Sequence, residues 1–463
     1  MLQKTKVATN NIIQKPNCFS ITLLSLILLT VYPFTTTASY HDSQRFLSIL
    51  IFSILGYNLL IDLKLSMLQI ASFILFSLLG LISTLLSPLP LWSGIEFLLF
   101  FSILSIVLSF KAEINSEYIY KTVLTFTLLN LIYIVRSLVN YVIVIAHQSV
   151  LDRDIIIDGF SNIRFYAQFI SWTIPFILAF ISTHPQAKYK SLMWTVTILS
   201  TGLVLLSGTR AFILGILFSL LSIYWLVPQL AKQYFKVNII NMLAALVIYI
   251  TMVFIIPYSF DIDNTTLLMQ NIGRDMTNSS GRLEIWLITL RVFLENPYFG
   301  VGPMMLALEG TYTGVAHPHN MPLQILAEWG GIMAFLIFTL LVYLALSWKK
   351  LLFLTPPERN LLAFPISASI SSALAVSMVD GIIVMPVSLI YLCLMLGLAN
   401  ALWVSWTPDT LRFNINKYWA VILYAPILVL TVITTYQWLY PDLLALGASH
   451  PRFWQNGILI RPN

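Results

Sequence analysis

Residues 279–331 read SSGRLEIWLITLRVFLENPYFGVGPMMLALEGTYTGVAHPHNMPLQILAEWGG and form the one long polar interval of the chain. The interval contains His317 and His319, two of the six histidines, only two residues apart. Apolar runs long enough to cross a membrane lie on both sides of it. It therefore separates two hydrophobic blocks, and we expect the side chains that do chemistry to lie in it.

The composition excludes a soluble domain. Of 463 residues, 58% are hydrophobic and only 10% are charged, whereas soluble domains carry about 25% charged residues. The sequence predicts an all-α polytopic membrane protein surrounded by membrane lipids. The net charge of +6 reports the orientation of the loops and does not indicate a nucleic-acid partner.

Apolar runs predict about 12–13 transmembrane helices and one large periplasmic loop. Three lysines precede the first run. We interpret this run as an uncleaved anchor, because many further spans follow it. The runs lie near 19–36, 46–63, 67–86, 91–110, 122–146, 164–182, 191–207, 211–228, 238–257, 321–347, 361–379, 384–404 and 418–436.

Lysine and arginine predict the orientation. With the N-terminus in the cytoplasm and alternating spans, every lysine falls in a cytoplasmic segment, together with Arg359 and Arg412. The other arginines fall outside or within a span. The predicted organisation is an N-terminal bundle (1–257), a periplasmic loop (258–320) and a C-terminal helical region with an external tail (321–463). The loops at 152–158, 207–210 and 380–381 would share that external face.

The loop itself should contain a helix. Ser279 or Ser280 can cap it, and Asn296-Pro297 should end it. Gly300 and Gly302 would permit a tight turn. Such a helix would lie along the membrane surface or cover a cavity. Its apolar positions, predicted to share one face, are Trp286, Leu290, Phe293 and Leu294, and the charged positions Glu284, Arg291 and Glu295 fall largely on the other.

His319 is the candidate general base, since an imidazole can accept a proton from an attacking hydroxyl. Asn320 should cap the next helix, whose positive end would disfavour an imidazolium at His319. His317 is the alternative base, and both could also be surface histidines without a role. A metal site needs at least a third ligand at a suitable spacing, and none is present, so we expect no metal and no cofactor. Cys18 and Cys393 are too far apart in sequence to suggest a disulfide or a metal site.

Arginines are the candidate anion ligands. Arg210 lies at the junction of two spans and could bind a phosphate or snorkel to headgroups. Arg282 opens the loop helix and could bind a phosphate or form an ordinary ion pair. Arg136 lies inside a long apolar run and is either the outer end of a tilted helix or a functional charge, and Arg164 allows similar interpretations. Asp380 is either part of a simple turn or a carboxylate that orients His319 or an arginine.

Three ordered elements resemble a known family. They are Ser207-Gly208-Thr209-Arg210-Ala211; then Gly281-Arg282, Trp286, Asn296-Pro297 and Gly300-Val301-Gly302; and then His319-Asn320, Leu323-Gln324 and Glu328-Trp329-Gly330. Together they are similar to bacterial O-antigen ligases, O-antigen polymerases and protein O-oligosaccharyltransferases, over about 200–345. A thirteenth span and an external tail depart from the family's usual twelve spans.

The resemblance implies a metal-independent, inverting membrane glycosyltransferase of the C type in the bacterial inner membrane. The donor would be a glycan on undecaprenyl diphosphate, and the acceptor a hydroxyl on the periplasmic face. Carried over by position, His319 is the base, and Arg210 and Arg282 bind the diphosphate. O-antigen ligation to lipid A–core is our first interpretation, and polymerase or protein O-oligosaccharyltransferase activity is the alternative.

A polysaccharide or lipid transporter is the alternative from another class. It would favour inverted repeats with matching helix interruptions. No such pairing is visible in the sequence.

Overall fold

The computed structural model describes Leu23, Leu26 and residues 40–61, 63–110, 114–160, 162–272, 281–308, 315–407, 412–440 and 452–454. The first predicted span, near 19–36, lies almost wholly outside the described residues. The first half contains α2 (Tyr40–Gly56), η2 (Tyr57–Leu60), β1 (Leu63–Ser66), α3 (Met67–Leu85), α4 (Pro90–Ser109), α5 (Ser116–Ala146), α6 (Arg153–Ile156), α7 (Ile163–Thr183), α8 (Lys190–Leu206) and α9 (Ala211–Leu226). The second contains α10 (Pro228–Ile250), η3 (Thr251–Ile255), α11 (Ile256–Ser259), α12 (Thr265–Ile272), α13 (Arg282–Glu295), η4 (Met305–Ala307), α14 (Met321–Leu354), α15 (Pro357–Ser377), α16 (Pro386–Trp406), β2 (Arg412–Ile415) and α17 (Lys417–Leu439).

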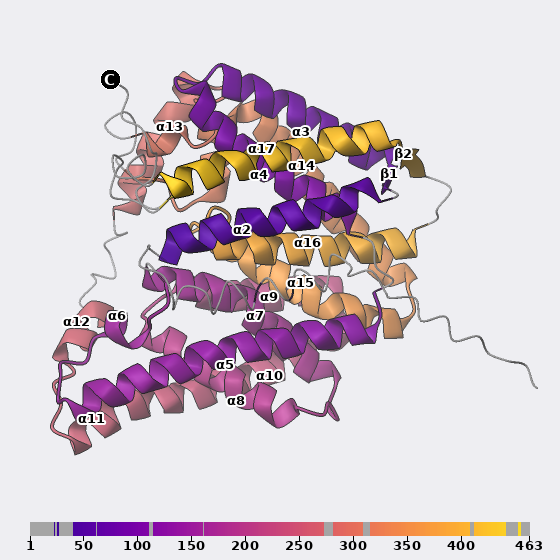
Figure 1. The fold of residues 1–463 in the computed structure, drawn as a ribbon. Coiled ribbons are helices and arrows are strands. Elements are labelled where there is room, and N and C mark those ends of the chain that lie inside the picture. Colours follow the sequence, from indigo (N-terminus) through magenta and orange to yellow (C-terminus); the bar gives the residue numbers. More distant parts are fainter. Residues whose placement is uncertain are drawn as a thin grey trace, which may run out of the picture.

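The chain is an all-α polytopic membrane protein. Ten helices of the described part are long and apolar enough to cross a membrane, and α8 and α9 are shorter apolar helices. The long helices lie roughly side by side in Figure 1. Asparagine side chains accept hydrogen bonds from first-turn N–H groups of α5, α7, α14 and α17. These caps satisfy donors that the helix itself leaves unpaired.

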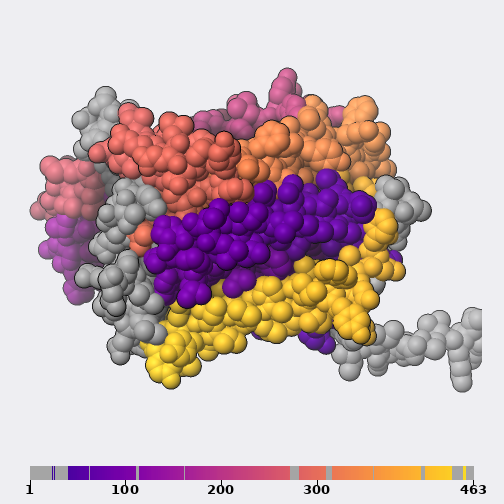
Figure 2. All heavy atoms as spheres, turned by 90° about the horizontal axis from the view of Figure 1, so that it is seen from above, coloured from indigo at the N-terminus to yellow at the C-terminus, as the bar shows by residue number. Residues whose placement is uncertain are grey.

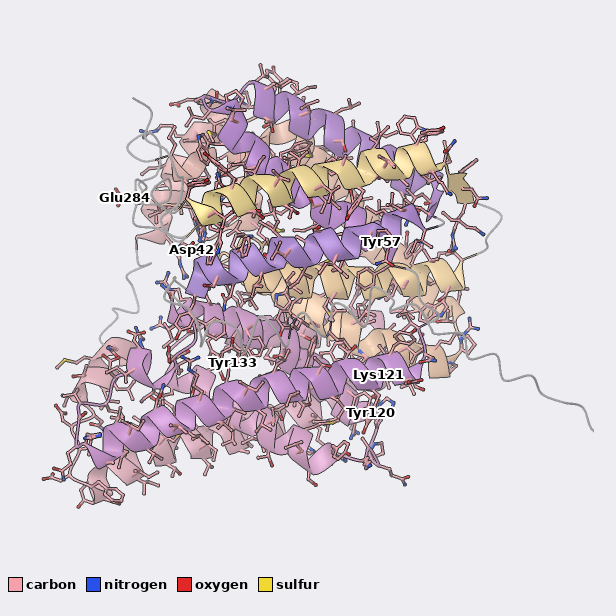
Figure 3. All side chains as sticks on the ribbon, in the orientation of Figure 1. Asp42, Tyr57, Tyr120, Lys121, Tyr133 and Glu284 are labelled. Carbon is pink, nitrogen blue, oxygen red and sulfur yellow. The ribbon has the colours of Figure 1, made fainter. Side chains whose placement is uncertain are left out.

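The two ends of the bundle differ. One end, which we call the site end, carries α6, α11, α12 and α13, and the opposite end carries the antiparallel pair β1–β2 (Figure 1). Figure 3 places Asp42 and Glu284 at the site end and Tyr57 and Lys121 at the opposite end. The predicted grouping of loops is confirmed, because loops from both halves of the chain meet at the site end. The short β1–β2 ribbon was not predicted.

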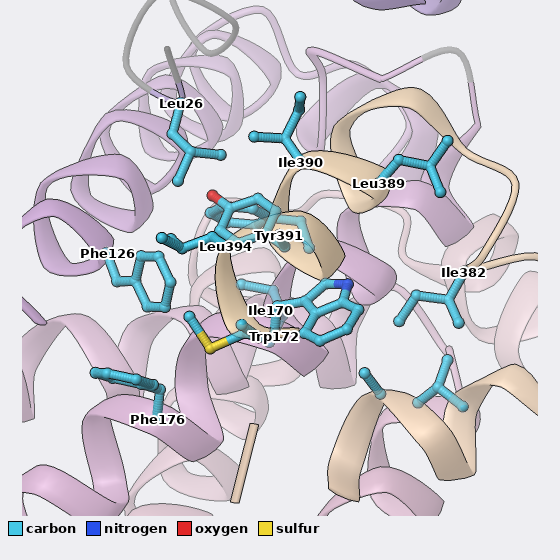
Figure 4. Close-up of a cluster of buried hydrophobic side chains, with 14 of the residues drawn as sticks. Leu26, Phe126, Ile170, Trp172, Phe176, Ile382, Leu389, Ile390, Tyr391 and Leu394 are labelled. Carbon is cyan, nitrogen blue, oxygen red and sulfur yellow. The ribbon is translucent and has the colours of Figure 1, made fainter. Parts of the chain in front are cut away.

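Helix α7 forms the centre of the bundle. It is almost wholly buried and contacts α5, α8, α9, α10, α15 and α16. Figure 4 shows Trp172 and Phe176 of α7 in a buried cluster with Phe126 and Tyr391. On another face, α3 and α4 lie between α17 and the region that contains α13 and α14 (Figure 2). Because α7 is held on so many sides, its first turn is a rigid support for polar side chains at the site end.

Helix α14 is interrupted at Gly330, whose φ of 81° and ψ of 169° are not helical. The break releases backbone groups, and the turn after α13 binds them. Val301 N–H donates to Ala327 O and Gly302 N–H donates to Glu328 O, each at 2.9 Å. A Cβ on Gly330 would lie 2.2 Å from Tyr298 O, so only glycine fits. The turn predicted at Gly300 and Gly302 is confirmed by their positive φ angles, and its role is to join α13 to the broken α14.

Candidate functional site

The segment 315–320 carries both candidate histidines and is fixed from two sides. Trp286 of α13 donates from Nε1 to Pro318 O at 2.9 Å. Asn320 caps α14 by accepting from Leu323 N–H at 3.0 Å, and its Nδ2 donates to Met378 O at 3.1 Å beyond the end of α15. The cap predicted at Asn320 is therefore confirmed, and the loop is bound to three helical regions.

His319 lies beside a buried carboxylate. Its Nδ1 is 3.4 Å from Asp380 Oδ1, and the side chains are 20% and 3% exposed, respectively. Asp380 also accepts from Gln168 Nε2 at 3.2 Å and from Gly381 N–H at 2.7 Å. These donors hold the carboxylate facing the imidazole. Asp380 does lie in the turn that follows α15, but its buried carboxylate also faces His319, which favours the second interpretation, a carboxylate that orients the imidazole.

His317 is buried behind His319. The ring centroids are 4.2 Å apart with the planes at 66°, and His317 Nδ1 accepts from His319 N–H at 3.3 Å. The ring packs on Gly381, where an added Cβ would meet it at 2.3 Å. Burial, followed by neighbouring His319, Arg452 and Arg164, lowers the pKa of His317 well below 6.5. His317 is thus a neutral acceptor that holds the backbone of His319.

Arg282 and Arg164 place two positive charges near this group. Arg282 begins α13 and Arg164 lies in the first turn of α7. Burial, followed by the charge of Arg164, lowers the pKa of Arg282, whereas Asp380 raises it. Arg282 Nε is buried and has no hydrogen-bond partner among the described residues. Arg164 and Asp380 both act electrostatically on Arg282. Among the described side chains of this group, two guanidinium groups therefore accompany one carboxylate, and an anion would neutralise the remaining positive charge.

Two other candidate arginines lie elsewhere. Arg210 precedes α9 with an exposed side chain, and no hydrogen bond joins it to His319, Arg164 or Arg282 in the described part of the chain. Arg136 pairs with Asp158 and also donates to Tyr40 Oη at 2.7 Å. That pairing supports a structural role for Arg136, which lies inside α5 and not at its end.

Helix α13 differs from the prediction in two ways. Gly281, with a φ of 73°, takes the position before the helix, and the proposed caps Ser279 and Ser280 lie outside the described residues. The four predicted apolar positions do lie on one side of the observed helix, but only part of that side meets the protein. Trp286 and Phe293 turn toward the protein, whereas Leu290 and Leu294 are exposed. The reason is that the protein-facing side is centred on Thr289 and Val292.

A further buried cluster, which was not predicted, lies next to the histidines. Arg452 follows α17 and pairs with Glu96 of α4 and Glu328 of α14 at 2.6 Å each. It also donates to Ala316 O at 2.9 Å, directly before His317. Of these three charged residues, only Glu328 belongs to one of the sequence elements quoted above.

Gln168, which donates to Asp380, was also not predicted as a site residue. It could have been identified as one, since it lies one helical turn after Arg164.

No group of three His, Cys, Asp or Glu side chains in the described ranges could hold a metal ion. Cys393 is buried, and Cys18 lies outside those ranges.

Comparison with known proteins identifies a family for part of the chain. No curated protein matches the chain. Residues 195–339 match the family model described as O-Antigen ligase. The matched region includes Arg210, Arg282 and His319, whereas Arg164 and Asp380 come from outside it. We conclude that residues 195–339 are an O-antigen ligase family domain, carried by a multi-pass α-helical membrane protein.

Proposed function

We propose that the protein is a metal-independent, inverting glycosyltransferase of the bacterial inner membrane that acts on the periplasmic face. The donor is a glycan on undecaprenyl diphosphate, and the acceptor hydroxyl belongs to lipid A–core. The acceptor oxygen attacks the anomeric carbon and gives its proton to His319. The bond from that carbon to the diphosphate breaks, and undecaprenyl diphosphate leaves with the electron pair.

The juxtaposition of His319 with Asp380, near Arg282 and Arg164, carries the proposal. His319 and Arg282 lie in the matched region. Asp380 faces Nδ1 of His319, which leaves Nε2 to accept the proton. A carboxylate in this position orients the imidazole and stabilises the imidazolium that forms. General-base catalysis of this kind contributes about 10²–10⁴-fold.

The arginines have the chemistry to bind the donor's diphosphate. Arg282 and Arg164 supply the positive excess, and the unpartnered Nε of Arg282 is a donor without an acceptor. Guanidinium groups bind phosphate oxygens with two parallel hydrogen bonds. They would also stabilise the negative charge that develops on the leaving diphosphate. Arg210 is proposed as a third contact, supported by the resemblance of its sequence element.

The proposal is tested first in a deletion strain. Rough lipopolysaccharide with accumulated lipid-linked polymer, restored by the wild-type chain, is expected for a ligase. Lipopolysaccharide capped with a single repeat would instead identify a polymerase. Intact lipopolysaccharide with an unglycosylated protein would identify an oligosaccharyltransferase, and unchanged glycans of all three kinds would refute the proposal.

Donor binding tests the arginines. Loss of a hydrogen bond to a charged group costs about 1.5–3 kcal/mol, so we expect Arg282→Ala and Arg164→Ala to weaken donor binding roughly 10- to 100-fold. Arg282→Lys should restore part of the affinity, because it keeps the charge without the planar fork. Arg291→Ala is the matched control, since Arg291 lies exposed on the same helix. Equal affinity in all four variants would contradict the assignment.

A further inference from the structure

Arg452, Phe453 and Trp454 form a short segment beyond α17 that is docked at the site end through its backbone. Arg45 Nε donates to Phe453 O at 2.9 Å, and His41 Nε2 lies 3.1 Å from Arg452 O. The Arg45 guanidinium also lies over the Phe453 ring, 5.1 Å from its centroid. Trp454 Nε1 donates to Gln437 of α17 at 3.2 Å. The segment is therefore held by contacts that do not need the side chain of Arg452.

The Arg452 side chain is fully buried (0% exposed) and uses both sides of its guanidinium. Nε donates to Glu96 Oε2 at 3.0 Å, and Nη2 donates to Glu96 Oε1 and to Glu328 Oε2, each at 2.6 Å. With Arg45 nearby, two arginines balance two carboxylates. Buried charges are tolerated when they are paired and hydrogen-bonded in this way.

The third guanidinium nitrogen of Arg452, Nη1, is the one that is relevant to function. Because Glu96 fixes one edge of a rigid, planar group, the direction of Nη1 is also fixed. Nη1 donates to Ala316 O at 2.9 Å, and Ala316 directly precedes the His317-Pro318-His319 segment. On the far side of His317, Trp286 holds Pro318 O. The backbone that leads to His319 is thus held by a tail residue on one side and by α13 on the other.

We propose that Arg452 is a positioning residue for glycan transfer. Its guanidinium, oriented by Glu96 and Glu328, holds the loop that presents His319 to the acceptor hydroxyl. The proposal rests on the proposed function of His319 as the base. A purely structural role would differ, because it would require only that the buried carboxylates be neutralised, with no effect specific to the loop.

The test uses the full chain in lipid nanodiscs and three variants. Arg452→Gln removes the charge and the fork, and Arg452→Lys keeps the charge. Trp454→Phe is the control for general damage to the tail, because it removes the hydrogen bond to Gln437 and part of a buried ring without touching the guanidinium. Steady-state transfer from a lipid-linked glycan to lipid A–core gives kcat and the donor KM. Hydrogen exchange measured by mass spectrometry reports on 315–320, with α7 as the internal reference.

A displacement of about 1 Å in a reacting group can cost roughly 100-fold in rate. We therefore expect Arg452→Gln to lower kcat about 100-fold with little change in donor KM, faster exchange in 315–320, and unchanged exchange in α7. Arg452→Lys should recover part of kcat, and Trp454→Phe should resemble wild type. Wild-type kcat and exchange in Arg452→Gln would overturn the proposal. So would an equal loss in Trp454→Phe, which would show that any damage to the tail is sufficient.

Arg452→Gln leaves the buried carboxylates of Glu96 and Glu328 without the cation that they share. A second variant therefore tests the proposal in case Arg452→Gln does not fold. Arg452→Gln combined with Glu96→Gln removes one charge of each sign and still lacks the donor to Ala316 O. It should fold, transfer slowly and show fast exchange in 315–320; protection equal to wild type would overturn the proposal. If wild-type protein transfers no glycan, the proposed function fails, and the exchange data alone decide the role of Arg452.

Discussion

At the scale of single residues, His319 combines an unusual backbone with a functional side chain. Its φ is 53°, a left-handed conformation that few residues other than glycine adopt. The hydrogen bond from its own N–H to His317 Nδ1 and the helix cap formed by Asn320 hold it in this conformation. Strained backbone of this kind costs about 1–3 kcal/mol and is often found at functional sites. The strain and the nearby Asp380 both single out His319 rather than His317.

His319→Asn is the most direct test of the base. Asparagine tolerates a positive φ better than most residues, so the loop should keep its conformation without an imidazole. Transfer should fall about 10²–10⁴-fold, while donor binding stays close to wild type, because a base acts on the chemical step. Single-turnover transfer and donor binding are the measurements.

His317→Gln is the comparison for that variant. Its side-chain oxygen can still accept the His319 N–H, so we expect a milder loss. If His317→Gln were inactive while His319→Asn kept its activity, the catalytic assignment would be reversed.

The depressed pKa of His317 also predicts how stability depends on pH. Between the pKa of folded His317 and the ordinary value of 6.5, the unfolded chain binds more protons at this position than the folded chain does. Stability therefore falls as pH drops below about 6.5. His317→Gln should have a shallower decline over that range, measured as the melting temperature in nanodiscs from pH 7.5 to 5. Parallel curves for the two proteins would show that His317 does not contribute to the decline.

At the scale of elements, α13 presents three different faces. Arg282 and Trp286 turn toward the protein, and the side chains of Glu284, Arg291 and Glu295 are exposed. An exposed leucine stripe lies between these two faces, formed by Leu283, Leu287, Leu290 and Leu294, with exposures of 58%, 59%, 39% and 66%. A helix with protein, apolar and charged sides suits the boundary between lipid and water. The position of α13 along the membrane surface is still a prediction. The leucine stripe now specifies which side of the helix should face the lipid.

Spin labels on α13 test this geometry. Leu287→Cys and Arg291→Cys, each in a chain without Cys18 and Cys393, carry labels one helical turn apart. The label at Leu287 should be more accessible to oxygen, which concentrates in lipid, and the label at Arg291 to a water-soluble nickel chelate. Equal preference for the nickel chelate at both positions would place the whole helix in water.

At the scale of the whole molecule, the site end and the tail lie together. Arg452 contacts the histidine loop, while β2 and the first turn of α17 lie at the opposite end. If the lysine-rich end is cytoplasmic, as the basic residues predict, both the candidate site and the tail face the periplasm. The helices of the described part alternate in direction consistently with this orientation.

Alkaline phosphatase fusions check the orientation, because the enzyme is active only outside the cytoplasm. A fusion after Asn463 should be active, and a matched fusion after Thr407, between α16 and β2, should be inactive. The opposite pattern would invert the orientation and place His319 on the cytoplasmic side.

The fold class and most of the helices were predictable from the amino-acid sequence. Hydropathy depends on local composition, so twelve of the thirteen predicted runs, all those from 46–63 onward, could be compared with the structure, and each corresponds to a helix. The cap at Asn320 and the turn at Gly300 and Gly302 were predictable for the same reason, since each depends on a few neighbouring residues. The motif elements also pointed to His319 and Arg282 before their surroundings were known.

The surroundings of those residues depend instead on contacts between distant parts of the chain. Gln168 and Asp380 are 212 positions apart, and Arg452 and Glu96 are 356 apart. The pairing of such residues depends on how the helices pack, which composition and periodicity do not specify. The sorting of α13 into three faces was missed for the same reason, because periodicity shows which residues share a side and not which side meets the protein. The local pattern thus determined the elements, and long-range packing assembled the site from them.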